Sequence, residues 1–142
     1  TEIYTLSLHD ALPIFSHYSH RSDTDFSAAI YYGKMIVEQY LSNPPKPEIY
    51  LNVNFPERDI DSIKGIKFCH QGKGQWIKEF EDRTDPYGSH YYWMTGEFFN
   101  LEPDNRDSDH NLVKEGYISI VPHKIDTTDY SEVDRLSKLW KM

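Results

Sequence analysis

The sequence predicts an α/β chain with an extended β-hairpin and a C-terminal helix. Three observations predict this class. An amphipathic helical pattern covers residues 26–42, short alternating strand patterns follow between residues 49 and 121, and a second helical pattern covers residues 131–141. This order fits either an α+β fold or the last part of an α/β protein.

Composition sets the first limits on function. The 142 residues suffice for one domain, and 15% aromatic residues argue against a disordered chain. The net charge of −8 argues against binding to a nucleic-acid backbone. No apolar run is long enough to span a bilayer and no signal peptide is visible, so we expect no membrane partner. The single cysteine, Cys69, cannot form a disulfide framework, which favours a cytoplasmic protein.

Residues 1–14, TEIYTLSLHDALPI, differ in character from the rest of the chain. Codons for this string resemble a common short-read sequencing adapter, so we interpret the segment as artefactual and exclude it from fold reasoning. Without Glu2 and Asp10 the net charge changes from −8 to −6. The alternative is a genuine short helix or strand whose leucines pack on the body. Sequencing the underlying DNA decides between the two.

The first helix and strand have clear signals. After a polar, His-rich loop over 15–21, the segment 22–25 offers N-cap residues for a helix over 26–42. The proline-rich stretch 43–47 ends that helix. Apolar and polar residues then alternate over 49–55, which predicts a strand.

The remaining elements follow in order. Residues 66–69 alternate as a strand, and strands over 76–80 and 91–94 flank the turn sequence at Asp85 to form a hairpin over about 75–95. Residues 97–115 form a long polar segment with Pro103 and many acidic residues. GYISIV (116–121) predicts a strand, 122–129 a loop, and Ser131 an N-cap for the helix over 131–141.

The hairpin carries an unusual aromatic content. Trp76, Tyr91, Tyr92 and Trp93 would sit poorly on a monomer surface, so we interpret them as an oligomer contact. One alternative is that they close the core of a monomer. Another is stacking on nucleic-acid bases, which the acidic balance disfavours.

Other constellations are weak. His17 and His20 with Asp23 and Asp25 could bind a metal, but a solvated loop before a helix explains them better. The acidic run 104–109 does not fit a calcium loop. The glycines of 71–75 lack a phosphate-loop frame, and Cys69 is most simply a packing residue. No self-sufficient catalytic site follows from these residues.

Six motifs in order resemble the C-terminal half of the SurE family (survival protein E), metal-dependent 5′/3′-nucleotidases. These are DFSAA (25–29), LNVNFP (51–56), IKGIKFCHQG (63–72), DPYG (85–88) followed by Tyr92-Trp93, Ser108-Asp109 before GYISIVP (116–122), and DTT (126–128). Tyr130 stands where family members often have histidine.

The resemblance implies a Rossmann-like phosphatase acting on nucleoside monophosphates with a divalent metal, Mg or Mn. The family's metal ligands lie in NDDG and SGxN motifs, and neither motif occurs in this sequence. We therefore carry over no catalytic or metal residue, expect this chain to hold no metal, and expect it to be inactive alone. The domains we expect are an artefactual 1–14, a nucleotidase-domain remnant over 15–56, and a hairpin and oligomerisation region over 57–142.

In the family, the hairpin and the C-terminal helix reach onto neighbouring subunits. The resemblance thus implies a homo-oligomer, dimer or tetramer, with the four hairpin aromatics as contacts. Two rival functions remain: a non-enzymatic assembly module, and a small independent metal enzyme built on His17 and His20.

Overall fold

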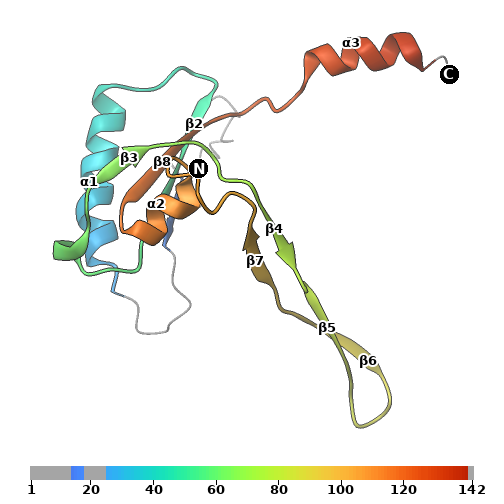
Figure 1. Ribbon diagram of the computed structural model, residues 1–142. Coiled ribbons are helices and arrows are strands. Elements are labelled where there is room, and N and C mark those ends of the chain that lie inside the picture. Colours follow the sequence, from blue (N-terminus) through green and yellow to red (C-terminus); the bar gives the residue numbers. More distant parts are fainter. Residues whose placement is uncertain (1–13, 18–24, 141–142) are drawn as a thin grey trace, which may run out of the picture.

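A four-stranded mixed sheet forms the body of the chain (Figure 1). The computed structural model describes residues 14–17 and 25–140. The strand order is β1-β2-β8-β3, with β1 (Ile14–His17), β2 (Ile49–Phe55), β3 (Ile66–Phe68) and β8 (Ile118–Lys124). β1 is parallel to β2, β2 is antiparallel to β8, and β3 is parallel to β8. The predicted α/β class is confirmed, and β2 and β3 lie where their patterns predict.

One face of the sheet packs against α1 (Ser27–Ser42). The alternation over 49–55 sends every second side chain into this interface. The core cluster consists of Ile36, Leu51, Val53, Phe55, Ile118 and Ile120. The helix begins after its N-cap residue Phe26, whose carbonyl accepts from the Ile30 N–H at 2.9 Å. Asp25, one residue earlier, accepts hydrogen bonds from the Ser27 backbone N–H and hydroxyl, each at 2.8 Å. The prediction of an N-cap within 22–25 is therefore wrong, although Asp25 does bond to the first turn.

β1 is a strand that the sequence pattern did not predict. Residues 15–21 were expected to form a loop, yet 14–17 pair with residues 52–55. Phe15 stacks on Phe55 with ring centroids 5.9 Å apart. Four residues are too few for a periodicity to emerge, so only the partner strand reveals this element. The expectation for 18–24 lies outside the described residues.

The opposite face of the sheet carries α2 (Asp109–Glu115), which buries Leu112. The long polar segment 97–115, for which no element was predicted, contains β7 (Glu97–Asn100) at its start and α2 at its end. α2 has only seven residues, too few for a helical periodicity. The helix ends at Gly116, a residue type typical of helix C-termini. Gly116 adopts φ 100°, and its N–H donates to the carbonyls of Leu112 and Val113.

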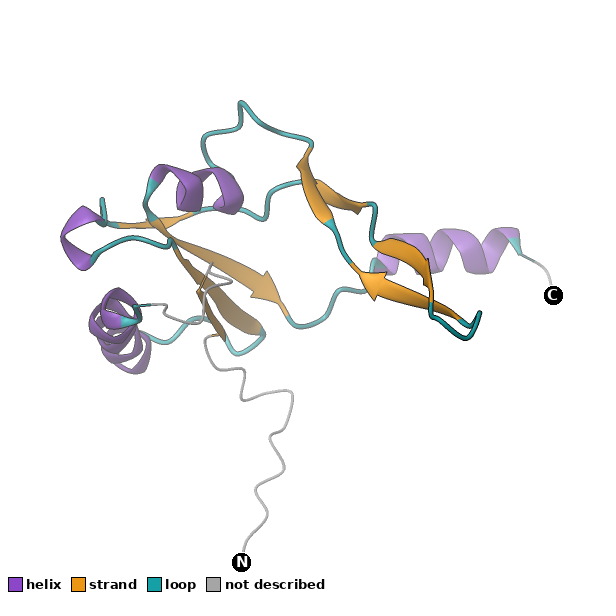
Figure 2. Ribbon diagram, turned by 90° about the horizontal axis from the view of Figure 1, so that it is seen from below, coloured by secondary structure: helices purple, strands orange, loops and turns teal. Residues whose placement is uncertain are grey.

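The predicted hairpin is confirmed and is longer than expected. We call residues 74–100 the arm; it projects away from the sheet (Figures 1 and 2). Its root ladder pairs β4 (Gly74–Ile77) with β7, and its distal ladder pairs β5 (Phe80–Thr84) with β6 (His90–Met94).

The predicted continuous strand over 76–80 is wrong, because the pairing breaks between the two ladders. Lys78 adopts φ 52° and Gly96 φ 152° at this break. Thr95 bridges it, with its hydroxyl donating to the Lys78 carbonyl at 2.7 Å and its N–H to the Glu79 carbonyl at 2.9 Å. The turn at the tip is confirmed, since Gly88 N–H donates to the Asp85 carbonyl at 3.0 Å.

The C-terminal helix is confirmed as α3 (Tyr130–Leu139), with no buried residue. It lies apart from the sheet in both views (Figures 1 and 2). Its cap is Asp129, which accepts from the Glu132 N–H at 3.1 Å, so the prediction of Ser131 as N-cap is wrong. β8 also runs to Lys124, beyond the predicted end at residue 121. Pro122 is tolerated there because β3 pairs only with residues 118–120.

Candidate functional site

The four predicted contact residues do not form one patch. Trp76 lies in the root ladder, opposite Phe98, with ring centroids 5.8 Å apart. Tyr91 and Trp93 occupy alternate positions of β6 and so share one face of the distal ladder. Tyr92 lies between them and faces the other way. The structure thus distributes these aromatics over both faces of the arm.

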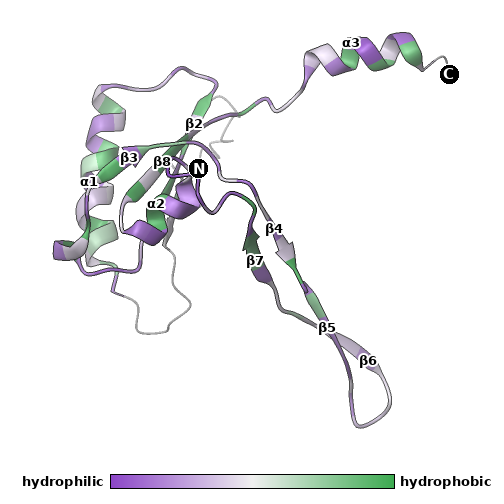
Figure 3. Cartoon of the chain, in the orientation of Figure 1, coloured by the Kyte–Doolittle hydropathy of each residue, from purple (hydrophilic) through white to green (hydrophobic). Residues whose placement is uncertain are grey.

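All four side chains are exposed, which contradicts the alternative that they close a monomer core. Trp76 is 59% exposed, Tyr91 40%, Tyr92 65% and Trp93 54%. The Arg83 guanidinium lies 4.9 Å from the Trp93 ring centroid, a cation–π contact that holds this ring in place. Apolar and polar residues alternate along the arm and α3 (Figure 3). The role of the four hairpin aromatics as an oligomer contact stays a prediction.

The described residues do not supply a metal centre. No group of three or more His, Cys, Asp or Glu side chains within 14–17 and 25–140 could hold an ion. Asp25 is engaged at the start of α1, while His20, Asp23 and the side chain of His17 lie outside what the structure describes. The described residues therefore do not fit the divalent metal that the family resemblance implies, and we derive no step through it.

The acidic run 104–109 instead belongs to the junction between the arm and the sheet. Asn111 lies at the centre of this junction, where the Asn111 side-chain amide donates to the carbonyls of Glu102 at 2.9 Å and Asn105 at 2.7 Å. Its own carbonyl accepts from the Asn100 amide at 2.8 Å. Asn111 is only 9% exposed, so these bonds lie away from solvent. The junction fixes the root of the arm on α2.

A polar pocket of about 270 Å³ lies beside this junction. Its lining comes from β2, the 71–72 loop, the root of the arm and α2: Asn52, Asn54, Gln71, Gly72, Trp76, Phe98, Asp109, His110 and Val113. Asp109 accepts through Oδ1 from the N–H groups of Gly72 at 2.9 Å and His110 at 2.7 Å. Sequence reasoning missed this pocket because its residues lie far apart along the chain.

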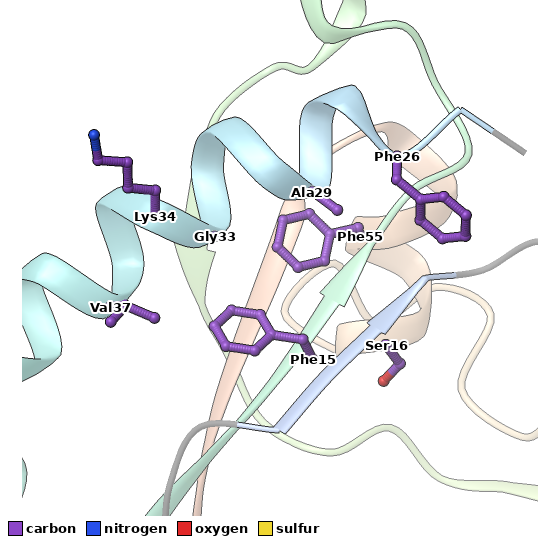
Figure 4. A pocket seen from close by; sticks show the side chains of 8 residues that line it. All are labelled: Phe15, Ser16, Phe26, Ala29, Gly33, Lys34, Val37 and Phe55. Atoms are coloured by element: carbon purple, nitrogen blue, oxygen red, sulfur yellow. The ribbon is translucent and has the colours of Figure 1, made fainter.

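Two apolar hollows flank α1. One of about 310 Å³ opens at the β1 side, where Phe15 and Phe55 face Gly33 and Lys34 is the single charged residue lining it (Figure 4). The other, about 440 Å³, lies between α1 and the β3 side of the sheet and includes Met35 and Phe68. Neither places a nucleophile next to a base.

Cys69 is a free, partly buried thiol. Burial, followed by the charge of Asp109, raises its pKa to about 11. Its Sγ lies 3.8 Å from the Ile120 carbonyl. The prediction of a packing residue agrees with this position.

Fold and pockets together define an α/β protein with a projecting β-arm. A sequence model described as "Survival protein SurE" matches residues 10–78. The 5′-nucleotidase SurE of Phocaeicola vulgatus is 41% identical over 128 residues, 90% of this chain and 49% of the relative. That of Flavobacterium johnsoniae is 39% identical over 84% of this chain and 46% of its own length.

A solved structure agrees with these relatives. The crystal structure of the SurE protein from Aquifex aeolicus superposes with a TM-score of 0.73 at 30% identity, covering 92% of this chain and 52% of the other. We identify the chain as a partial sequence of the SurE family. It spans about half the length of the curated relatives it matches.

The match to the family begins at residue 10, inside the segment 1–14 that we interpret as artefactual. That interpretation stays a prediction, and residues 1–13 lie outside the described part of the chain. The division at residue 56 also stays a prediction. β8 pairs with β2 across it, so both proposed segments contribute to one sheet. No helix in the described ranges is long and apolar enough to cross a membrane.

Proposed function

We propose that this chain is part of a SurE-type 5′-nucleotidase that hydrolyses nucleoside monophosphates with a divalent metal, Mg or Mn, in the cytoplasm. The observation that carries the proposal is the 37–41% identity to several 5′-nucleotidase SurE relatives. The second support is the superposition on a SurE crystal structure. The chain spans about half of each relative, so the whole enzyme's activity is assigned to a longer protein.

We further propose that the 142-residue chain has no phosphatase activity of its own. The motifs NDDG and SGxN, which the family resemblance associates with the metal, do not occur in its sequence. A divalent ion polarises the phosphate and activates the attacking water, so loss of its ligands removes the chemistry.

The test is an assay of the pure chain with AMP and p-nitrophenyl phosphate in Mn²⁺. The full-length Phocaeicola vulgatus relative, at equal concentration, is the positive control. We expect turnover by the relative and none above buffer by the chain. Metal-dependent turnover by the chain that chelator removes would overturn the proposal of inactivity.

The exposed arm supports a second function, assembly with copies of itself. Phe80, Tyr92 and Met94 are 62–82% exposed on one face of the distal ladder, and Trp93 is 54% exposed on the other. Apolar area of this kind is typical of a contact surface.

Light scattering after size exclusion tests assembly. We expect an oligomer, dimer or tetramer, that the double substitution Tyr91→Ser, Trp93→Ser shifts toward monomer. Tyr87→Ser is the matched control, because Tyr87 lies at the tip, 94% exposed, outside the proposed contact set. A wild-type monomer at all concentrations would refute assembly. An unchanged oligomer in the double variant would refute Tyr91 and Trp93 as its contact.

A further inference from the structure

The polar pocket beside the arm joins two kinds of recognition group. Its aromatic members form a chain of ring contacts: Trp76 meets Phe98 edge to face, and Phe98 lies 4.6 Å from His110, centroid to centroid. Its polar members include the side-chain amides of Asn52 and Gln71. Ring faces together with amide groups are the usual means of holding a heteroaromatic ligand.

The amides of Asn52 and Gln71 are available to a ligand. Within the described part of the chain, neither side chain has a hydrogen-bond partner, and both line the pocket. Asn54, by contrast, is engaged: its amide donates to the Ser119 hydroxyl at 3.4 Å and its carbonyl accepts from Ser16 at 3.0 Å. The two open amides can each donate and accept.

Asp109 sets the charge that the pocket accepts. Its Oδ1 accepts from two backbone N–H groups, and Oδ2 has no donor among the described residues. A carboxylate with a free oxygen favours a ligand that presents N–H donors. The same charge repels a phosphate, which would have to remain outside.

Gly72 lines the pocket, and Gly74 packs against the lining residue Phe98. A Cβ at Gly72 would lie 3.1 Å from Asp109 Oδ1 and 3.2 Å from the Ser108 Cβ. A Cβ at Gly74 would overlap the ring of Phe98. Glycine at both positions lets the backbone lie close to α2 and to the arm. A larger residue at either position would displace the neighbouring side chains.

We propose that this pocket binds the amino-bearing base of a nucleoside, with the base against the aromatic side chains and its N–H groups toward Asp109. Pockets that enclose whole ligands measure about 300–1,000 Å³, and a space of about 270 Å³ suits one ring system with the sugar outside. The base is then the part of the nucleotide substrate that this half of the protein recognises, and this assignment rests on the proposed function.

Calorimetric titration of the 142-residue chain, checked by circular dichroism to be folded, tests the assignment. The ligands are adenosine, purine riboside, which lacks the amino group, and ribose 5-phosphate, which lacks the base. We expect adenosine to bind, purine riboside to bind more weakly, and ribose 5-phosphate not to bind. Adenosine carries no phosphate, so the result is independent of whether the chain hydrolyses anything.

The variant arm uses Asn52→Ala with Gln71→Ala. Each neutral hydrogen bond is worth about 2–10-fold in affinity, so the pair should weaken adenosine binding about 10-fold or more. Gln75→Ala is the matched control, since Gln75 is exposed on β4 and does not line the pocket; it should leave the affinity unchanged.

Three results would overturn the proposal. The first is no adenosine binding by the folded chain up to about 10 mM, above the millimolar range where weak affinities lie. The second is ribose 5-phosphate binding as well as adenosine. The third is an affinity that the double substitution leaves unchanged.

Discussion

Replacing Asn111 by alanine should weaken the attachment of the arm to the sheet and lower the free energy of unfolding. The substitution removes two hydrogen bonds to the carbonyls of Glu102 and Asn105 and one from the Asn100 amide. Each buried neutral hydrogen bond contributes about 0.5–1.5 kcal/mol, and carbonyls left unsatisfied add to the cost. The expected loss is therefore about 2–4 kcal/mol in the free energy of unfolding.

Urea denaturation of Asn111→Ala measures this loss, and hydrogen exchange locates it. The Leu101 amide, which donates to the Lys73 carbonyl at 3.0 Å, should exchange faster in the variant. Asn43→Ala is the matched control: Asn43 is exposed and its amide makes one 3.4 Å side-chain contact, so the loss should stay below about 0.5 kcal/mol. Equal stability of the two variants would refute the view of Asn111 as the centre of the junction.

Three further predictions concern single groups. Hydrogen bonds from Thr128 and Tyr130 lower the pKa of Asp126 to about 2, so their stabilisation is present above pH 4 and lost as pH falls through about 2; Tyr130→Phe should raise that pKa, measured by carboxyl NMR. A Cys69 pKa of about 11 against 9.0 implies about 100-fold less thiolate at pH 8, so a disulfide reagent should react about 100-fold more slowly than with the unfolded chain; equal rates would contradict the burial. Gly116→Ala places alanine at φ 100°, which should cost about 1–2 kcal/mol in thermal unfolding, and no change in melting temperature would count against it.

The long periodic elements could be predicted from sequence. The helix over 26–42, the strand over 49–55 and the hairpin turn at Asp85 each carry their own signal within ten or so residues. β1 and α2 could not be predicted in this way. Four residues in one case and seven in the other become regular only because a partner, β2 or β8, covers them.

The sequence predicted which aromatic residues are exposed, but not how they and the pocket residues are arranged. The aromatic excess of the hairpin pointed to an exposed surface, and Trp76, Tyr91, Tyr92 and Trp93 are indeed exposed. Their separation onto two faces and two ladders follows from strand register, which a single-strand pattern does not reveal. The pocket brings Asn52 next to Asp109, 57 positions later in the sequence. No local spacing rule reaches that far.

The break in the arm has a consequence for how its length can change. Trp76 pairs with Phe98 below the break and Phe80 with Met94 above it, so each strand contributes the same number of residues between the two ladders. An insertion in one strand alone would shift the register of the distal ladder relative to the root ladder. A single residue added to both strands would keep the pairing but turn Trp93 to the opposite side. The arm can therefore lengthen or shorten with its aromatic sides preserved only by matched changes of two residues in each strand.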